Sequence, residues 1–162
     1  MVERCSNRVA NLAHFLSRNA ARWPSGPAVV QDGVTLSWSQ IDSRVSALAK
    51  GLQSEFGVSK GDGLLVQAQN SHQMIEIMLA AFRLGAIWVP CNFRQAPGET
   101  AYAAEKAKAK VFLCDADFGA QAEAVRNARD QLTGCVTIGA SDFGTSYEDL
   151  LSRYQGQVLK NE

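Results

Sequence analysis

The chain has 162 residues, of which 46% are hydrophobic and 20% charged, and its sixteen basic residues balance sixteen acidic ones. This length fits one domain of roughly 100–200 residues, and the apolar content is sufficient to offset the chain entropy that keeps polar chains disordered. Zero net charge argues against a nucleic-acid partner, because binding phosphates along a nucleic acid requires an excess of Lys and Arg.

Helical and extended segments alternate along the chain. Hydrophobic spacing predicts helices over 9–23, 39–56, 71–84, 97–107, 118–132 and 147–154. Short apolar or β-branched runs predict strands over 28–30, 34–36, 64–66, 86–89, 111–114 and 135–138. This alternation predicts an α/β fold with a largely parallel sheet. We expect a single α/β subdomain over residues 1–162, with a frayed polar tail over about 155–162.

Local signals define the ends and faces of several of these elements. Asp32-Gly33 between two β-prone runs predicts a hairpin. Ser39 with Asp42 resembles a capping box at the start of the second helix. The continuous apolar run 86–89 predicts a strand that is buried on both faces. The expected apolar stripe of the third helix is Ile75, Met78, Leu79 and Phe82.

The cysteines and the most apolar stretch indicate a cytoplasmic protein. The four cysteines form no C-x-x-C motif: Cys5, Cys91, Cys114 and Cys135. With only two histidines they match no zinc spacing, so reduced thiols are expected, Cys91 among them as a buried structural thiol. The stretch 71–90 contains Glu76 and Arg83, so it is not expected to span a membrane.

Asp115 and Asp117 follow a predicted strand, where α/β sites usually form. Such an Asp-x-Asp pair can hold Mg²⁺ or supply a nucleophile, as in haloacid-dehalogenase-like phosphatases. However, Gly119 stands where that family usually has Thr or Val, and no second acidic pair follows a strand. The favoured alternative is structural, with Asp117 capping the next helix and Asp115 turning the chain. A Mg²⁺-dependent phosphatase is therefore the less favoured function.

An ordered set of motifs resembles AMP-forming adenylating enzymes, although neither GxxxxGK[ST] nor GxGxxG occurs. Residues 36–42 (LSWSQID) look like the family's early L-[TS]-[YW]-x-x-[LI]-x motif. Residues 61–71 resemble its unit of Gly-Asp, strand and Asn-Ser, and residues 82–90 (FRLGAIWVP) resemble L-[RK]-x-G-A-x-x-V-P. The continuation through 92–94 and 97–111 is similar to the acyl-CoA synthetase branch of that superfamily.

The resemblance implies acid:CoA ligase chemistry, in which ATP and a carboxylate give an acyl-adenylate and the CoA thiol then displaces AMP. ATP, Mg²⁺ and CoA are thereby implied for a full-length member, and fatty acid metabolism as its setting. That chemistry requires a Gly/Ser/Thr phosphate loop, a Mg²⁺-holding carboxylate, a ribose-binding Asp and a mobile Lys. None of these motifs is in this chain. We therefore expect an N-terminal segment without the rest of the large domain and the C-terminal domain, using no cofactor alone and inactive in isolation.

Few functional residues can be carried over from the family. The loop after its Val-Pro strand end tends to lie near the CoA nucleotide, which here points to Asn92, Phe93 and Arg94 as CoA- or substrate-binding residues. The guanidinium of Arg94 suits a phosphate. The alternative is that Asn92 and Arg94 cap the strand end and form a local salt bridge. No catalytic residue and no metal ligand is assigned.

A function of a different class is a stand-alone interaction module descended from such an enzyme. In either case, a subdomain of a larger fold exposes the surface that faces the rest of that fold. The expected partner is therefore the rest of its own enzyme or a second copy, held through exposed apolar surface.

Overall fold

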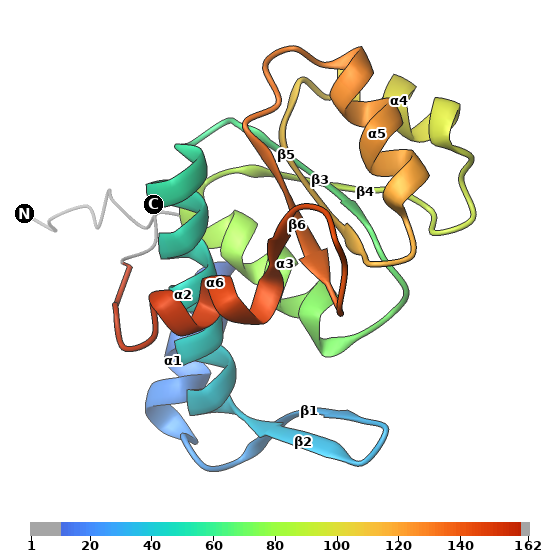
Figure 1. Ribbon diagram of the computed structural model, residues 1–162. Coiled ribbons are helices and arrows are strands. Elements are labelled where there is room, and N and C mark those ends of the chain that lie inside the picture. Colours follow the sequence, from blue (N-terminus) through green and yellow to red (C-terminus); the bar gives the residue numbers. More distant parts are fainter. Residues whose placement is uncertain (1–10, 160–162) are drawn as a thin grey trace, which may run out of the picture.

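The computed structural model describes residues 11–159, and a five-stranded parallel sheet forms its centre (Figure 1). Its strands are β3 (Gly63–Gln67), β4 (Ile87–Pro90), β5 (Ala109–Asp115), β6 (Gly134–Ile138) and β7 (Thr145–Ser146). They are ordered β4-β3-β5-β6-β7, and every neighbouring pair is parallel. The predicted α/β fold with a parallel sheet is confirmed.

Helices cover both faces of this sheet (Figure 1). One layer contains α1 (Ala13–Arg22), α2 (Trp38–Phe56), α3 (His72–Leu84) and α6 (Tyr147–Arg153). The opposite layer contains α4 (Pro97–Lys106) and α5 (Gly119–Ala128). Each face of the sheet therefore has its own apolar core.

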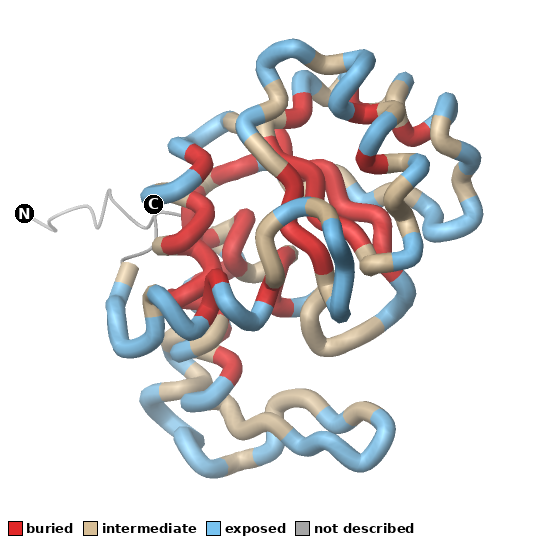
Figure 2. Tube along the Cα trace, viewed as in Figure 1, coloured by how far each residue is buried: buried red, intermediate tan, exposed pale blue. Residues whose placement is uncertain are grey.

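The central strands are buried on both faces, and Figure 2 shows them in the red that marks buried residues. All five residues of β3 are buried. Leu64 and Val66 pack in the core beneath α2 and α3, whereas Leu65 packs in the core beneath α4 and α5. A strand covered on both sides has no polar face, which is why 64–66 and 111–114 are continuous apolar runs in the sequence.

The long helix α2 begins one residue earlier than the sequence pattern predicts, and its N-cap lies two residues earlier than expected. Its N-cap is Ser37, whose hydroxyl accepts from the Gln40 N–H while the Gln40 side chain accepts from the Ser37 N–H. This reciprocal pair is the capping box, so the prediction built on Ser39 and Asp42 was wrong. Asp42 does not cap the helix, and its carboxylate instead pairs with Arg83.

The predicted hairpin is confirmed. It directly precedes α2 and stands apart from the five-stranded sheet, at the N-terminal end of that helix (Figure 1). Its strands are β1 (Pro27–Gln31) and β2 (Val34–Ser37), paired antiparallel. Asp32 and Gly33 both have positive φ, 47° and 80°, as a tight two-residue hairpin turn requires.

The buried face of α3 differs from the predicted stripe. Ile75 is exposed, whereas Glu76 and Arg83 are buried together with Ile77, Ala80, Ala81 and Leu84. The predicted stripe did not include these two charged residues, and both make ion pairs inside the fold. The prediction of a buried β4 is also wrong. This strand lies at the edge of the sheet, and the Ile87 side chain is 54% exposed.

The remaining elements follow the predicted order with shifted ends. Helix α5 ends at Ala128, earlier than expected, and the two-residue strand β7 was not predicted. Residues 9–10 of the first predicted helix and 160–162 of the tail lie outside the described residues. Between residues 11 and 159, no helix is both long and apolar enough to cross a bilayer.

Candidate functional site

The order of the strands creates a topological switch point at the carboxyl edge of the sheet, the place where open α/β sheets form a ligand-binding crevice. From β3 the chain passes through α3 to β4, and then returns through α4 to β5 on the other side of β3. The connection that leaves β3 runs through α3 to β4, whereas the connection that leaves β5 runs through α5 to β6, so the chain leaves the carboxyl ends of β3 and β5 in opposite directions and on opposite faces. In open α/β sheets, ligands bind at this topological switch point.

Gln67, the last residue of β3, is fully buried beneath this edge. Its Nε2 donates to the carbonyl oxygens of Asn92 and Gln95, both at 3.1 Å. Its Oε1 accepts from the Thr100 hydroxyl at 2.8 Å. One carboxamide thus fastens the loop after β4 and the first turns of α4 to the centre of the sheet. We call these contacts the Gln67 clamp.

The loop held by the Gln67 clamp contains the three residues to which the family resemblance pointed. The Asn92 Oδ1 accepts from the Arg94 N–H at 2.9 Å, so Asn92 closes the turn within the loop. Phe93 is 39% exposed, and the Arg94 guanidinium lies 4.8 Å from the centre of its ring. Among residues 11–159 that guanidinium makes no ion pair or hydrogen bond. This contact is of the local kind that the alternative expects for Asn92, whereas the salt bridge expected for Arg94 is not found among the described residues.

An exposed guanidinium stacked on an aromatic ring is well placed to bind an anion. The ring attracts the guanidinium through a cation–π contact, and the guanidinium N–H groups donate no hydrogen bond among residues 11–159. The planar guanidinium matches two oxygens of a phosphate or carboxylate. Because the loop backbone is held by the Gln67 clamp, Arg94 is presented from a fixed position at the switch point.

Asp115, the last residue of β5, connects the carboxyl end of β5 to the segment that follows β3. Its Oδ2 accepts from the Gln69 N–H at 2.8 Å, which joins the ends of β3 and β5. Burial raises the pKa of this carboxyl, the nearby Asp117 charge adds to the effect, and the Gln69 N–H opposes it. The Asp115 carbonyl accepts from the Phe118 N–H at 3.1 Å, so Asp115 does turn the chain as predicted.

Asp117 does not cap the helix, contrary to the sequence prediction. The N-cap of α5 is Phe118, and no side chain accepts a hydrogen bond there. Asp117 is exposed, and the described part of the chain contains no group of three or more His, Cys, Asp or Glu side chains arranged to hold a metal. The Asp115 carboxylate already accepts from Gln69, so no observation favours the phosphatase hypothesis.

Two buried ionic clusters lie in the layer formed by α1, α2, α3 and α6, and they connect the helices of that layer. In the first, Glu76 is fully buried and accepts from Arg44 Nε at 2.7 Å and from the Tyr147 hydroxyl at 2.6 Å. Arg44 also makes a bidentate pair with Glu148, at 2.7 and 3.0 Å. This cluster joins α2, α3 and α6. Burial and the Glu76 charge raise the pKa of Tyr147, whereas the Arg44 hydrogen bonds lower the pKa of Glu148.

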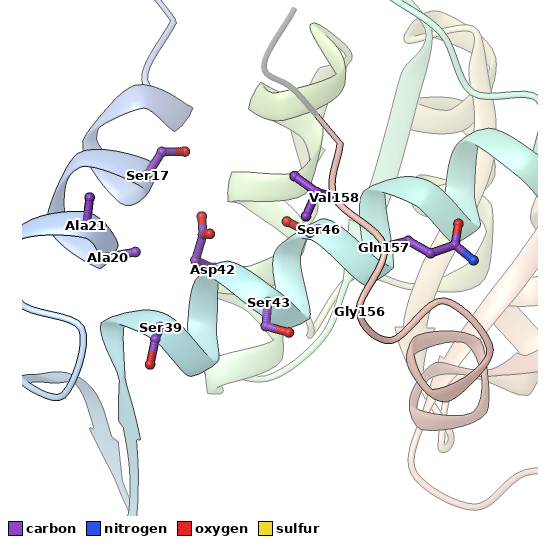
Figure 3. Close-up of a pocket in the computed structure, with 10 residues that line it drawn as sticks. All are labelled: Ser17, Ala20, Ala21, Ser39, Asp42, Ser43, Ser46, Gly156, Gln157 and Val158. Atoms are coloured by element: carbon purple, nitrogen blue, oxygen red, sulfur yellow. The ribbon is translucent and has the colours of Figure 1, made fainter.

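The second cluster centres on Arg83, the basic residue of the FRLGAIWVP motif. Its guanidinium is buried and donates to Asp42 Oδ1 at 2.6 Å, to the Ser17 hydroxyl at 3.2 Å and to the Ser46 hydroxyl. Arg83 thus joins α1, α2 and α3. A cavity of about 400 Å³ lies beside it, between α1, α2 and residues 156–158 (Figure 3). The Asp42 carboxylate reaches between α1 and α2 there, but Arg83 already engages it.

Comparison with known proteins agrees with this architecture. Residues 16–158 match the AMP-binding enzyme family. The indoleacetate–CoA ligase of Aromatoleum aromaticum is 31% identical over 143 residues, which are 88% of this chain and 28% of that enzyme. The feruloyl-CoA synthase of an Amycolatopsis species is 32% identical over 106 residues, which are 65% of this chain and 21% of that enzyme. The chain belongs to the AMP-binding enzyme family.

Solved structures show the same fold. A protein of Rhodopseudomonas palustris described as a long-chain-fatty-acid CoA ligase aligns with 93% of this chain, with a TM-score of 0.83 and 28% identity, over 37% of its own length. The coronafacic acid ligase of Pectobacterium brasiliense aligns with 93% of this chain, over 31% of its own, with a TM-score of 0.82 and 17% identity. The chain therefore spans between 21% and 37% of the length of these relatives.

The Gln67 clamp predicts a specific loss of stability. Replacing Gln67 by Leu leaves the carbonyls of Asn92 and Gln95 without this donor, so we expect unfolding free energy to fall by about 1–3 kcal/mol. Amide hydrogen exchange over 92–95 should become faster. Thr100→Val removes only one hydrogen-bond donor and keeps a similar side-chain volume, so the free energy of unfolding should fall by less. Urea unfolding and exchange measurements test this, and unchanged exchange over 92–95 in Gln67→Leu would contradict the clamp.

Two carboxylates predict opposite responses to pH. The raised pKa of Asp115 means that folding favours its protonated form, so Asp115→Asn should stabilise the chain near neutral pH, with the gain shrinking as pH falls toward about 4 and absent below it. The lowered pKa of Glu148 means that folding favours its charged form, so Glu148→Gln should destabilise near neutral pH, again converging with the parent in acid. Urea unfolding between about pH 3.5 and 7 measures both, and shifts of equal sign would refute the assignment.

Proposed function

We propose that this chain is the N-terminal part of an AMP-forming acid:CoA ligase and that its crevice contributes to binding CoA. Family membership supports the class, because the matched relatives include several enzymes named as CoA ligases. The observation that supports CoA as the acceptor is Arg94, whose exposed guanidinium is stacked on Phe93 at the switch point without a partner among residues 11–159. Such a group suits the phosphates at the nucleotide end of CoA.

In the proposed reaction, a carboxylate attacks ATP to give an acyl-adenylate and pyrophosphate. The thiol of CoA then attacks the acyl carbon, forming a thioester and releasing AMP. The contribution of this chain is positional: Arg94 binds phosphate oxygens, Phe93 fixes the plane of the guanidinium, and the Gln67 clamp fixes the loop. The residues that act on ATP and Mg²⁺ are assigned to other segments of the ligase.

The acid stays open within this proposal. The matched relatives are named for indoleacetate, ferulate and long-chain fatty acids, so fatty acid metabolism is one setting among several. A cytoplasmic location is part of the proposal, since reduced thiols persist there. Cys91, predicted to be buried, is partly exposed, and burial raises its pKa. This half-buried thiol is therefore mainly protonated at neutral pH.

The CoA proposal can be tested on the chain itself with adenosine 3′,5′-bisphosphate, the nucleotide end of CoA. Titration followed by amide NMR should shift the signals of 92–95 saturably, and more weakly at high salt. Arg94→Gln should reduce the affinity about tenfold, because it removes a charge-assisted bidentate contact. Arg18→Gln is the matched control, since Arg18 also stacks on a neighbouring ring, 5.2 Å from Phe15, but lies on α1. Equal affinity in the parent and Arg94→Gln would exclude this role.

We also propose that the chain alone does not catalyse adenylation, because it carries no Gly/Ser/Thr phosphate loop. Acid-dependent exchange of pyrophosphate into ATP should therefore stay at background with aryl, arylacetic and long-chain acids. The indoleacetate–CoA ligase assayed with indoleacetate serves as the positive control. Exchange above background that depends on the acid would disprove this part of the proposal.

The partner we propose is the rest of the ligase, which would cover apolar side chains at the outer edge of the sheet. Ile87 on β4 and Tyr102 on α4 are 54% and 62% exposed. Left uncovered, such side chains favour self-association. Sedimentation velocity should show association that rises with concentration and weakens in Ile87→Glu, but not in Val158→Glu, which changes the exposed C-terminal segment. A parent chain that stays monomeric at high concentration would count against this surface.

A further inference from the structure

A pair of thiols lies outside the crevice and is not used by the proposed function. Cys114 on β5 and Cys135 on β6 project from neighbouring parallel strands into the core beneath α5. Cys114 is opposite Thr137 in the register, so the two thiols meet diagonally, with their Sγ atoms 3.9 Å apart. Cys114 is fully buried and Cys135 is 9% exposed.

The surroundings make the two sulfurs unequal. Either thiol can donate in the contact between the two sulfurs, and with Cys114 as the donor this contact raises the pKa of Cys114 and lowers the pKa of Cys135. The positive charge of Arg126, on α5, lowers the pKa of Cys135 further and opposes the effect of burial. Cys135 is therefore the sulfur that loses its proton more readily of the two. A thiolate next to a second thiol is the arrangement of a redox pair.

We propose that Cys114 and Cys135 form a peroxide-sensitive pair that closes to a disulfide. The Cys135 thiolate attacks one oxygen of hydrogen peroxide, the O–O bond breaks, and protonation of the leaving hydroxide gives water and a sulfenic acid on Cys135. The Cys114 sulfur then attacks the Cys135 sulfur, the S–O bond breaks, and hydroxide leaves with the Cys114 proton as water. In total, two thiols lose two electrons and one peroxide becomes two waters.

Closing the bond requires the two sulfurs to approach and the oxidant to enter. A disulfide has a sulfur separation of about 2.05 Å, so the sulfurs must approach by about 2 Å. Because Cys114 and Cys135 are diagonal neighbours on β5 and β6, this approach includes a shift of the two strands relative to each other. The cover over the pair is α5, a ten-residue helix with no side-chain cap at its start. Local opening of such a short element admits a small oxidant. The bond would fix the end of β5 beside Asp115, next to the crevice.

Peptide mapping of the parent chain tests the pair without any substitution. Trypsin places the four cysteines in separate peptides, with Cys114 in 111–126 and Cys135 in 130–153. After treatment with hydrogen peroxide and blocking of free thiols, we expect a linked 111–126/130–153 species that disappears with dithiothreitol. It should exceed links to Cys5 or Cys91. Failure to form this link in the native chain, or linkage that appears only after unfolding in urea, would overturn the proposal.

Single variants test which sulfur reacts first. Cys114→Ser removes the second thiol, so dimedone should trap a sulfenic acid on peptide 130–153. Cys135→Ser should give at least about tenfold less dimedone adduct on 111–126, because the remaining thiol is protonated and buried. Cys91→Ser is the control and should leave the native link unchanged. Equal dimedone labelling in the two variants would overturn the assignment of Cys135 as the sulfur that reacts first. The peptide map of the parent chain tests the disulfide itself and does not depend on whether either variant folds.

Discussion

The candidate site depends on one buried carboxamide, that of Gln67 at the end of the central strand β3. Its hydrogen bonds to two loop carbonyls and to the Thr100 hydroxyl decide where the chain goes after β4. A buried amide that loses its partners costs more than the bonds contribute net, so the loop has little freedom to leave. The position of Arg94 follows from this constraint, and so does the start of α4.

Much of the fold could be predicted from the sequence because its strongest signals are local. The apolar runs of β3 and β5 identify central strands, and Asp32-Gly33 identifies the hairpin. The face of α3 could not be predicted in the same way. Periodicity treats Glu76 and Arg83 as solvated, but Arg44 and Asp42, far away in sequence, neutralise them in the interior. Burial of a charge depends on a partner that a local pattern does not contain.

The contacts that position the candidate site could not be predicted, for a related reason. The family resemblance pointed to residues 92–94, which lie in the loop held by the Gln67 clamp, and their role in binding stays a prediction. Neither the Gln67 clamp nor the contact from Gln69 to Asp115 was foreseen, because both depend on which strands become neighbours. A glutamine closing an apolar strand was the only local signal for Gln67. On the other face of the sheet, the two ionic clusters join the helices α1, α2, α3 and α6 to one another.

The central claim is that the Gln67 clamp presents Arg94 to an anionic ligand. The most direct measurement is the affinity of Gln67→Leu for adenosine 3′,5′-bisphosphate, compared with Thr100→Val and the parent under conditions where all three are folded. The claim predicts clearly weaker binding in Gln67→Leu, although Arg94 is intact, and a smaller loss in Thr100→Val. Equal affinity in all three chains would show that the position of Arg94 does not depend on the clamp, and would contradict the claim.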